Sequence, residues 1–144
     1  MNHSRRRILL ALCAAVLAPA WAHAQGPATE VVMYKSESCG CCGKWAEHMQ
    51  KHGFRVVSHN VQDLAGIKSK NRVPASLGSC HTALVGGYAI EGHVPADVVR
   101  RLLKEKPAGV IGIAVPGMPP SAPGMDSPVP KPCLLYTSDA ADEL

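Results

Sequence analysis

The chain has 144 residues, of which 47% are hydrophobic and only 4% aromatic, and its 15 Lys and Arg exceed its 11 Asp and Glu to give a formal net charge of +4. A chain of this length is expected to form one small domain with a modest core. Basic residues form no cluster beyond the first residues and aromatic side chains are few, so the composition argues against a nucleic-acid-binding protein.

The first residues have the pattern of an export signal. A basic stretch, Arg5 to Arg7, precedes an apolar run over residues 8–17, and Ala22-His23-Ala24 matches a small-x-small cleavage site. The apolar run is shorter than the roughly 20 residues that a membrane span needs. We therefore expect residues 1–24 to be a cleaved signal peptide, the mature protein to have no membrane span, and its location to be the periplasm. The pattern fits both the general and the twin-arginine export routes.

The last residues have a different character. Residues 133–143, which begin Cys133-Leu134-Leu135, resemble the translation of a sequencing-library adapter. We therefore expect residues 133–144 to be an artefact that replaces the natural C-terminus, and we exclude Cys133 as a ligand. A disordered acidic tail is the alternative. The domain is then expected to span residues 25–132.

The spacing of apolar residues predicts a series of short elements. In chain order they are a strand over residues 31–34, a helix over 40–52 ended by Gly53, a strand over 54–61, a short helix capped by Asp63, hairpin strands over 82–85 and 88–90, and a helix opened by Pro95. The first helix joins two strands, so those strands are expected to be parallel. From Val115 the chain is rich in Pro, Gly and Met, which predicts a loop over the domain surface or a frayed tail. This order is typical of an α/β, thioredoxin-like fold with a mixed sheet flanked by helices.

Three cysteines stand at the first junction between strand and helix. Cys39, Cys41 and Cys42 occupy the predicted helix N-terminus, where unpaired N–H groups and the helix dipole stabilise thiolates. Soft Cu(I) prefers thiolate and thioether ligands, and three close thiols suit it. In a thioredoxin-like layout the loop that carries Cys80 lies opposite this helix, so Cys80 is expected to be a fourth thiolate. A structural disulfide with one spare thiol is the alternative.

Further candidate ligands lie beyond the cysteines. We expect His93 to bind the metal, and Met118 and Met125 either to add thioethers, which need no deprotonation, or to pack the C-terminal loop against the domain. Two roles fit His81: it either binds the metal or makes a hydrogen bond to a carbonyl group. The remaining candidates are assigned to the core or to solvent: Trp45 and Met49 to the core, and His48, His52 and His59 to solvent.

Two classes of function fit these residues. One is a copper-binding protein that sequesters or transfers Cu(I). The other is a periplasmic thiol-disulfide oxidoreductase in which Cys39 is the nucleophile and Cys42 the resolving thiol, because these two have the C-x-x-C spacing. The extra Cys41 departs from two-thiol exchange and favours metal binding. A structural zinc or iron-sulfur module fits the number of thiols but not the methionine-rich loop.

Four motifs occur in an order that is typical of one family. They are Ser38-Cys39-Gly40-Cys41-Cys42-Gly43-Lys44-Trp45, Ser79-Cys80-His81-Thr82-Ala83, Glu91-Gly92-His93-Val94-Pro95-Ala96 and Val115-Pro116-Gly117-Met118-Pro119. Together they resemble the CopG-like periplasmic copper-resistance proteins. The resemblance implies a thioredoxin-like fold, cysteine ligation of Cu(I), copper redox activity, and copper ions and other periplasmic copper-handling proteins as partners. The chain departs from the family by ending before its closing strand.

Overall fold

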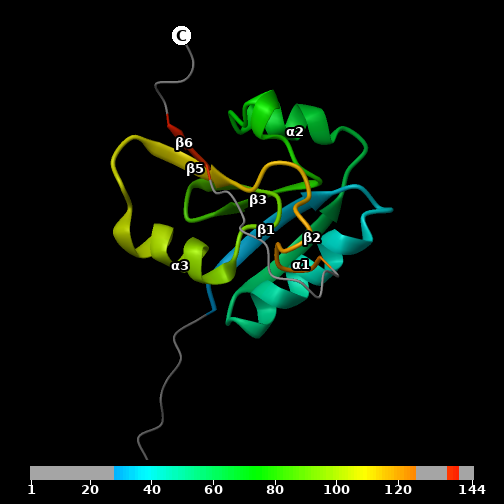
Figure 1. The fold of residues 1–144 in the computed structure, drawn as a ribbon, viewed down its shortest axis with the longest axis horizontal. Helices are drawn as coiled ribbons and strands as arrows, with labels where there is room; N and C mark the ends of the chain where they lie inside the picture. The colour runs from blue at the N-terminus through cyan, green and yellow to red at the C-terminus, as the bar shows by residue number, and fades with distance from the viewer. Residues whose placement is uncertain (1–27, 126–135, 140–144) are drawn as a thin grey trace, which may run out of the picture.

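The computed structural model describes residues 28–125 and the backbone of residues 136–139. The expected signal peptide, residues 1–24, and the other residues from 133 onward lie outside the described part. The described residues form one six-stranded sheet in the order β2-β1-β3-β4-β5-β6, with helices on both faces (Figure 1). The elements are β1 (Glu30–Lys35), α1 (Gly40–Lys51), β2 (Arg55–Asn60), α2 (Leu64–Lys70), the 3-10 helix η1 (Ala75–Leu77), β3 (His81–Val85), β4 (Tyr88–Glu91), α3 (Ala96–Glu105), β5 (Val110–Ala114) and β6 (Tyr136–Asp139).

The first part of the sheet is a β-α-β unit, as predicted. β1 and β2 are parallel, with Val31 opposite Val56, and α1 connects them. α1 begins at Gly40, and its N-cap residue Cys39 makes no side-chain capping hydrogen bond. Its buried residues recur at i, i+3, i+4 and i+7 and are Cys42, Trp45, Ala46 and Met49. This face packs on the core and leaves the first N–H groups of the helix at the cysteine cluster.

The antiparallel strand β3 brings Cys80 to the same edge of the sheet. β3 pairs with β1 in a register that sets His81 opposite Lys35, the last residue of β1. The chain enters α1 shortly after Lys35 and enters β3 directly after Cys80, so the two segments are neighbours. β3 then turns into β4 through Gly86 and Gly87, whose φ angles are 57° and 88°, which confirms the predicted hairpin.

Different helices cover the two faces of the sheet. α1 and α3 lie on one face and α2 on the other (Figure 1). α3 buries Ala96, Val99 and Leu102, as its apolar spacing predicted. On the other face, the predicted cap of α2 is confirmed, because the Asp63 carboxylate accepts a hydrogen bond from the Gly66 N–H at 2.7 Å. The core contains large, completely buried side chains: Trp45, Met33, Met49, Ile90, Val31 and Val85.

The sheet extends further than the sequence predicted. The apolar run Val110–Ala114 is strand β5, parallel to β4, and it had no assigned element in the sequence analysis. Residues 136–139, within the segment that the sequence analysis set apart from the domain, form β6, antiparallel to β5. Strand pairing uses backbone N–H and C=O groups and asks little of the side chains, so a short segment can complete an open edge. The pairing does not bear on the origin of the segment.

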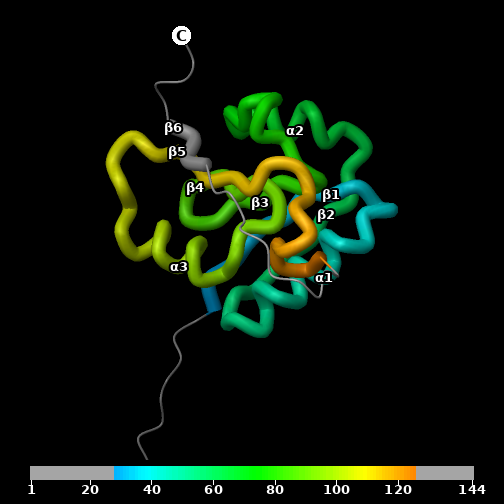
Figure 2. The backbone as a smooth tube through the Cα atoms, viewed as in Figure 1, coloured from blue at the N-terminus to red at the C-terminus, as the bar shows by residue number. Residues whose placement is uncertain are grey.

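The segment after β5 lies over the domain as a loop (Figure 2), which was one of the two predicted alternatives. Val115 and Ala122 are buried in the core. Gly124 has a φ of 85°, and a Cβ atom there would lie 2.6 Å from the backbone nitrogen of Trp45. The close approach therefore requires glycine, because any side chain would push the loop away from the first turns of α1.

Candidate metal centre

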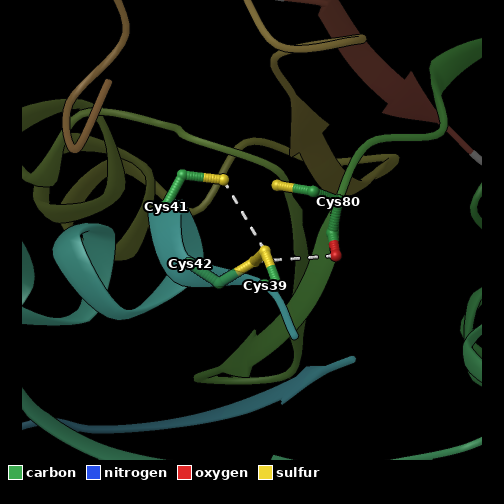
Figure 3. Close-up of side chains that lie close together, drawn as sticks. All are labelled: Cys39, Cys41, Cys42 and Cys80. Carbon is green, nitrogen blue, oxygen red and sulfur yellow. Dashed lines mark hydrogen bonds between the residues drawn. A yellow bond between two sulfur atoms is a disulfide. The ribbon is translucent and has the colours of Figure 1, made fainter. Parts of the chain in front are cut away.

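The sulfur atoms of Cys39, Cys41, Cys42 and Cys80 all lie within 4.8 Å of one another (Figure 3). Metal–thiolate bonds are about 2.3 Å long, so two sulfurs on one ion are separated by at most about 4.6 Å. The four sulfurs are therefore close enough to share one ion or a small cluster after small movements. Three come from the start of α1 and the fourth from the segment that leads into β3, as the sequence analysis expected.

Two of these cysteines are joined in the structure. A disulfide links Cys39 and Cys42, while Cys41 and Cys80 are free thiols. The Cys39 sulfur is also 3.6 Å from the Cys41 sulfur. A sulfur in a disulfide is not a thiolate, so the cluster offers all four thiolates only after a two-electron reduction that returns Cys39 and Cys42 to thiols.

The free thiol of Cys80 is perturbed by its surroundings. Burial, followed by the neighbouring Cys41, raises the pKa of Cys80 to about 11. The free thiol is therefore protonated at neutral pH. A bound soft metal ion deprotonates a coordinating thiol, so metal binding at Cys80 releases a proton and becomes weaker as the pH falls.

His93 is completely buried beside Cys80. Its Nδ1 lies 2.7 Å from the carbonyl oxygen of Pro123, and its Nε2 lies 3.0 Å from the Cys80 sulfur. A carbonyl only accepts hydrogen bonds, so Nδ1 carries the proton and donates it to Pro123. The lone pair of Nε2 then faces the sulfur. This is the arrangement in which an imidazole is ready to bind a metal, with its other nitrogen fixed by a second group.

His81 is also completely buried, and its ring contacts those of Trp45 and His93 at centroid distances of 4.5 and 5.0 Å. Its Nδ1 is 3.4 Å from the Cys80 sulfur, and its Nε2 is buried with no hydrogen-bond partner. Cys80, His81 and His93 form a second group of possible ligand atoms within 4.8 Å of one another. The sequence analysis offered a hydrogen bond to a carbonyl group as one alternative for His81. Neither ring nitrogen makes such a bond within the described part of the chain.

The two methionines of the loop occupy different environments. Met118 is 56% exposed, and the neighbouring Gly117 pairs with Ser79 through the backbone, next to Cys80. Met125 is half-buried and packs against the core cluster that includes Cys42. The loop thus carries both residues to the end of the domain that holds the cysteines, and their ligation stays a prediction.

The histidines assigned to solvent differ from one another. His52 and His59 are exposed, as expected. His48 is instead half-buried, and its Nε2 accepts a hydrogen bond from the Ala96 N–H at 3.2 Å. The side chain satisfies one of the first N–H groups of α3, whose N-cap residue Pro95 makes no side-chain capping hydrogen bond. The sequence analysis missed this role because it depends on the packing of α1 against α3.

Comparisons with known proteins identify the family. Two solved structures, Form 1 and Form 2 of a copper resistance protein CopG, are each 35% identical to the chain with a TM-score of 0.74. The matches cover 79% of this chain, 90% of the Form 1 chain and 91% of the Form 2 chain. This chain belongs to the CopG family. The family model described as a protein of unknown function, DUF411, matches residues 77–125, and no curated protein matches.

The CopG-like fold carries no spanning helix in its described part. Within residues 28–125 and 136–139, none of the helices has the length and apolar character needed to cross a membrane.

The sequence analysis missed two groups at the site, and both lie behind the candidate ligands. They are the carbonyl of Pro123, which orients His93, and Glu91, which holds the segment around Cys80. The motif that contains Glu91 was visible in the sequence, but its partners were not.

The buried histidines predict that the metal-free protein loses stability in acid. Burial, with smaller contributions from His93 and Lys68, lowers the pKa of His81 from 6.5 to about 3. Between these pH values the folded state binds fewer protons than the unfolded chain, so stability falls as the pH falls below 6.5. From about pH 7.5 to about pH 5 the loss from His81 alone is about 2 kcal/mol. Urea unfolding of the reduced, metal-free protein at both pH values measures it.

The matched variants are His81→Leu and His59→Leu. The first removes the buried imidazole and should reduce the loss of stability in acid, although His48 and His93, whose pKa values are also lowered by burial, keep part of it. The second removes an exposed imidazole and should leave the pH dependence unchanged. An equally steep loss of stability in the His81→Leu protein would contradict the assignment.

Proposed function

We propose that this protein is a periplasmic copper-binding protein that sequesters or transfers Cu(I) in copper resistance, with copper redox activity. The observation that carries the proposal is the convergence of four cysteine sulfurs within 4.8 Å at the N-terminus of α1. The two similar solved structures are of a copper resistance protein, which supports copper as the cargo. The export pattern of residues 1–24 supports a periplasmic location.

The chemistry of the donor set favours Cu(I) over harder ions. Cys39, Cys41, Cys42 and Cys80 are the proposed thiolate ligands, and His93, with its Nε2 facing Cys80, is the proposed nitrogen ligand. Within the two groups of possible ligand atoms found among the described residues, no Asp or Glu takes part. Thiolate and imidazole ligands suit Cu(I), whereas carboxylates suit Mg²⁺, Ca²⁺ and Mn²⁺. The positive end of α1 stabilises the thiolates in the cluster.

The proposed copper site predicts that the protein prefers Cu(I) to Zn(II) and that it binds Cu(I) most tightly when its cysteines are reduced. The reduced protein is expected to bind Cu(I) far more tightly than Zn(II), because the donor set is soft. Formation of the Cys39–Cys42 disulfide removes two of four thiolates and should weaken Cu(I) binding at least about tenfold. Anaerobic competition with a chromogenic Cu(I) chelator measures both forms. Zinc that is retained while copper is surrendered would overturn the copper assignment.

The second candidate is a thiol-disulfide oxidoreductase, which the Cys39–Cys42 disulfide at a helix N-terminus favours. Cys39 is partly exposed and could attack a substrate disulfide, while Cys42 is completely buried and would resolve the mixed disulfide. Cys41 takes no part in this exchange, whereas the copper site uses it. This difference separates the two functions.

Replacement of Cys41 by Ser therefore distinguishes a copper site from an oxidoreductase. The variant keeps the Cys39–Cys42 pair, so disulfide reductase activity in an insulin reduction assay should stay near that of the parent. Copper binding should fall by about tenfold or more if Cys41 is a ligand. Copper stoichiometry and insulin turnover are measured on the same preparation. Normal copper loading with retained turnover would show that Cys41 is not a ligand and would favour the oxidoreductase.

The loop methionines are proposed as auxiliary ligands, and the double variant Met118→Leu/Met125→Leu tests them. Leucine keeps the bulk and apolarity but removes the sulfur. Thioethers bind without releasing a proton, whereas Cys80 must lose one from a thiol of raised pKa, so the methionines should matter most in acid. Copper affinity should fall more at about pH 5 than at about pH 7.5. Equal affinity of variant and parent at both values means that the loop only packs against the domain.

A further inference from the structure

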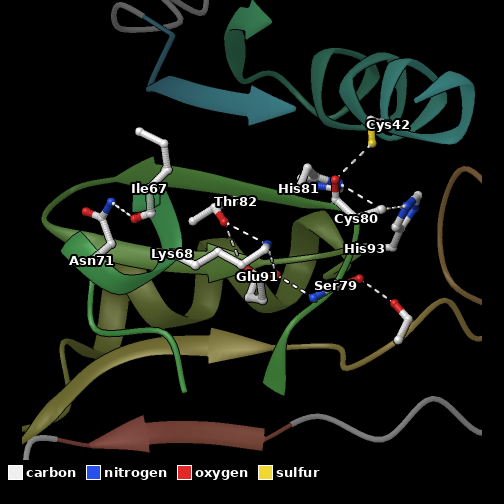
Figure 4. A network of polar contacts seen from close by, with 11 residues as sticks. Cys42, Ile67, Lys68, Asn71, Ser79, Cys80, His81, Thr82, Glu91 and His93 are labelled. Carbon is white, nitrogen blue, oxygen red and sulfur yellow. Dashed lines mark hydrogen bonds and ion pairs between the residues drawn. The ribbon is translucent and has the colours of Figure 1, made fainter. Parts of the chain in front are cut away.

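A buried carboxylate lies behind the cysteine and histidine ligands (Figure 4). Glu91, the last residue of β4, is 1% exposed. Its Oε1 accepts a hydrogen bond from the Ser79 N–H at 2.6 Å, and its Oε2 accepts one from the Thr82 hydroxyl at 2.7 Å. Ser79 and Thr82 flank the Cys80-His81 dipeptide. One carboxylate therefore holds the chain on both sides of the proposed ligand Cys80 and its neighbour His81.

Lys68 neutralises this carboxylate on the face of the sheet that α2 covers. Its ammonium group forms an ion pair with Glu91 and donates a hydrogen bond to the Thr82 hydroxyl at 3.1 Å. The Lys68 side chain is 17% exposed, so the pair is largely removed from water. Lys68 belongs to α2, which supplies none of the proposed ligands.

The backbone after Glu91 connects the same carboxylate to His93. The Gly92 N–H donates to the carbonyl of His81 at 3.0 Å, and Gly92 has a φ of 72°. A Cβ atom at Gly92 would lie 2.5 Å from the Ser79 hydroxyl and 2.7 Å from the carbonyl of Val115, so the chain turns here through a space that only glycine fits. The turn places His93 Nε2 at 3.0 Å from the Cys80 sulfur.

A buried ion pair is weak evidence for stability, because apolar side chains of similar volume often do as well. Here the carboxylate instead controls geometry, since its two hydrogen bonds hold the chain on both sides of Cys80-His81, which includes the proposed ligand Cys80. We propose that Glu91 is the positioning residue of the metal centre and, neutralised by Lys68, holds Cys80 in place against His93. This inference rests on the proposed copper site. Glu91 itself does not touch the metal.

The substitution Glu91→Gln tests the proposal. The amide keeps the size of the side chain, but its NH2 group faces one of the two donors and cannot accept from it. If Glu91 acts through Cys80, Cu(I) affinity should fall by about tenfold, the lower end of the range for residues that orient metal ligands. The same substitution is made in a Cys80→Ser background, where affinity should change by less than about twofold, because the group that Glu91 positions is already lost.

Two further variants keep the outcome clear. The double variant Lys68→Met/Glu91→Gln removes both buried charges and is tested in the same two backgrounds if the single variant does not fold. Glu105→Gln removes an exposed ion pair with Arg101 on α3 and should leave copper affinity unchanged. Thermal unfolding of each protein separates a loss of stability from a loss of positioning.

The results overturn the proposal in two cases. If Glu91→Gln leaves copper affinity unchanged, Glu91 does not position the site. If affinity falls equally in the parent and Cys80→Ser backgrounds, Glu91 only stabilises the fold. Failure of the proposed function is distinct from both, because the unsubstituted, reduced protein then fails to bind Cu(I) in the same chelator competition.

Discussion

The pairing of β3 with β1 is the constraint on which the site depends. In the β-α-β unit, α1 starts where β1 ends, so the first turn of the helix lies at the carboxyl edge of β1. β3 runs in the opposite direction and starts at that same edge, with His81 opposite Lys35. The antiparallel register therefore brings Cys80 to the three cysteines of α1. A shift by one residue would move His81 and its neighbours to the opposite face of the sheet.

The loop after β5 contacts His93 and Trp45 and so helps to fix the geometry of the same site. The carbonyl of Pro123 determines which nitrogen of His93 carries the proton, and Gly124 allows the loop backbone to approach Trp45. The Trp45 indole in turn donates to the carbonyl of Val94 at 2.8 Å, which follows His93 directly. The loop, α1 and His93 are thus linked through contacts that leave the Nε2 of His93 facing the Cys80 sulfur. A ligand oriented in this way loses little conformational entropy when it binds.

The same sulfur atoms serve two competing chemistries. Cys39 and Cys42 are either a disulfide or part of a four-thiolate set, and they cannot be both at once. In an oxidising compartment such as the proposed periplasmic location, the disulfide is the expected state of a free C-x-x-C pair, while a bound soft metal protects thiolates from oxidation. The proposed copper loading of this CopG-family chain and its oxidation would therefore be linked through the same two sulfurs.

Much of this protein is determined by local sequence pattern. The apolar spacing of Cys42, Trp45 and Met49 determines α1 and its buried face, and Gly86-Gly87 determines the hairpin, because both depend on neighbours within a few residues. The apolar run of β5 was also visible but was left unassigned, since a short apolar run does not distinguish strand from loop until it finds a partner. Cys80 was placed with the other cysteines only through the expected fold.

The tertiary structure alone decided which groups stand behind the ligands. Glu91 is a charged residue at the end of a short strand, and nothing near it in the sequence shows that its carboxylate reaches Ser79 and Thr82 or that Lys68 neutralises it. The role of His48 at the start of α3 was hidden for the same reason. Hydrogen bonds of this kind depend on the positions of elements that are distant along the chain. Apolar periodicity reports which face of an element is buried, but not which polar group it meets there.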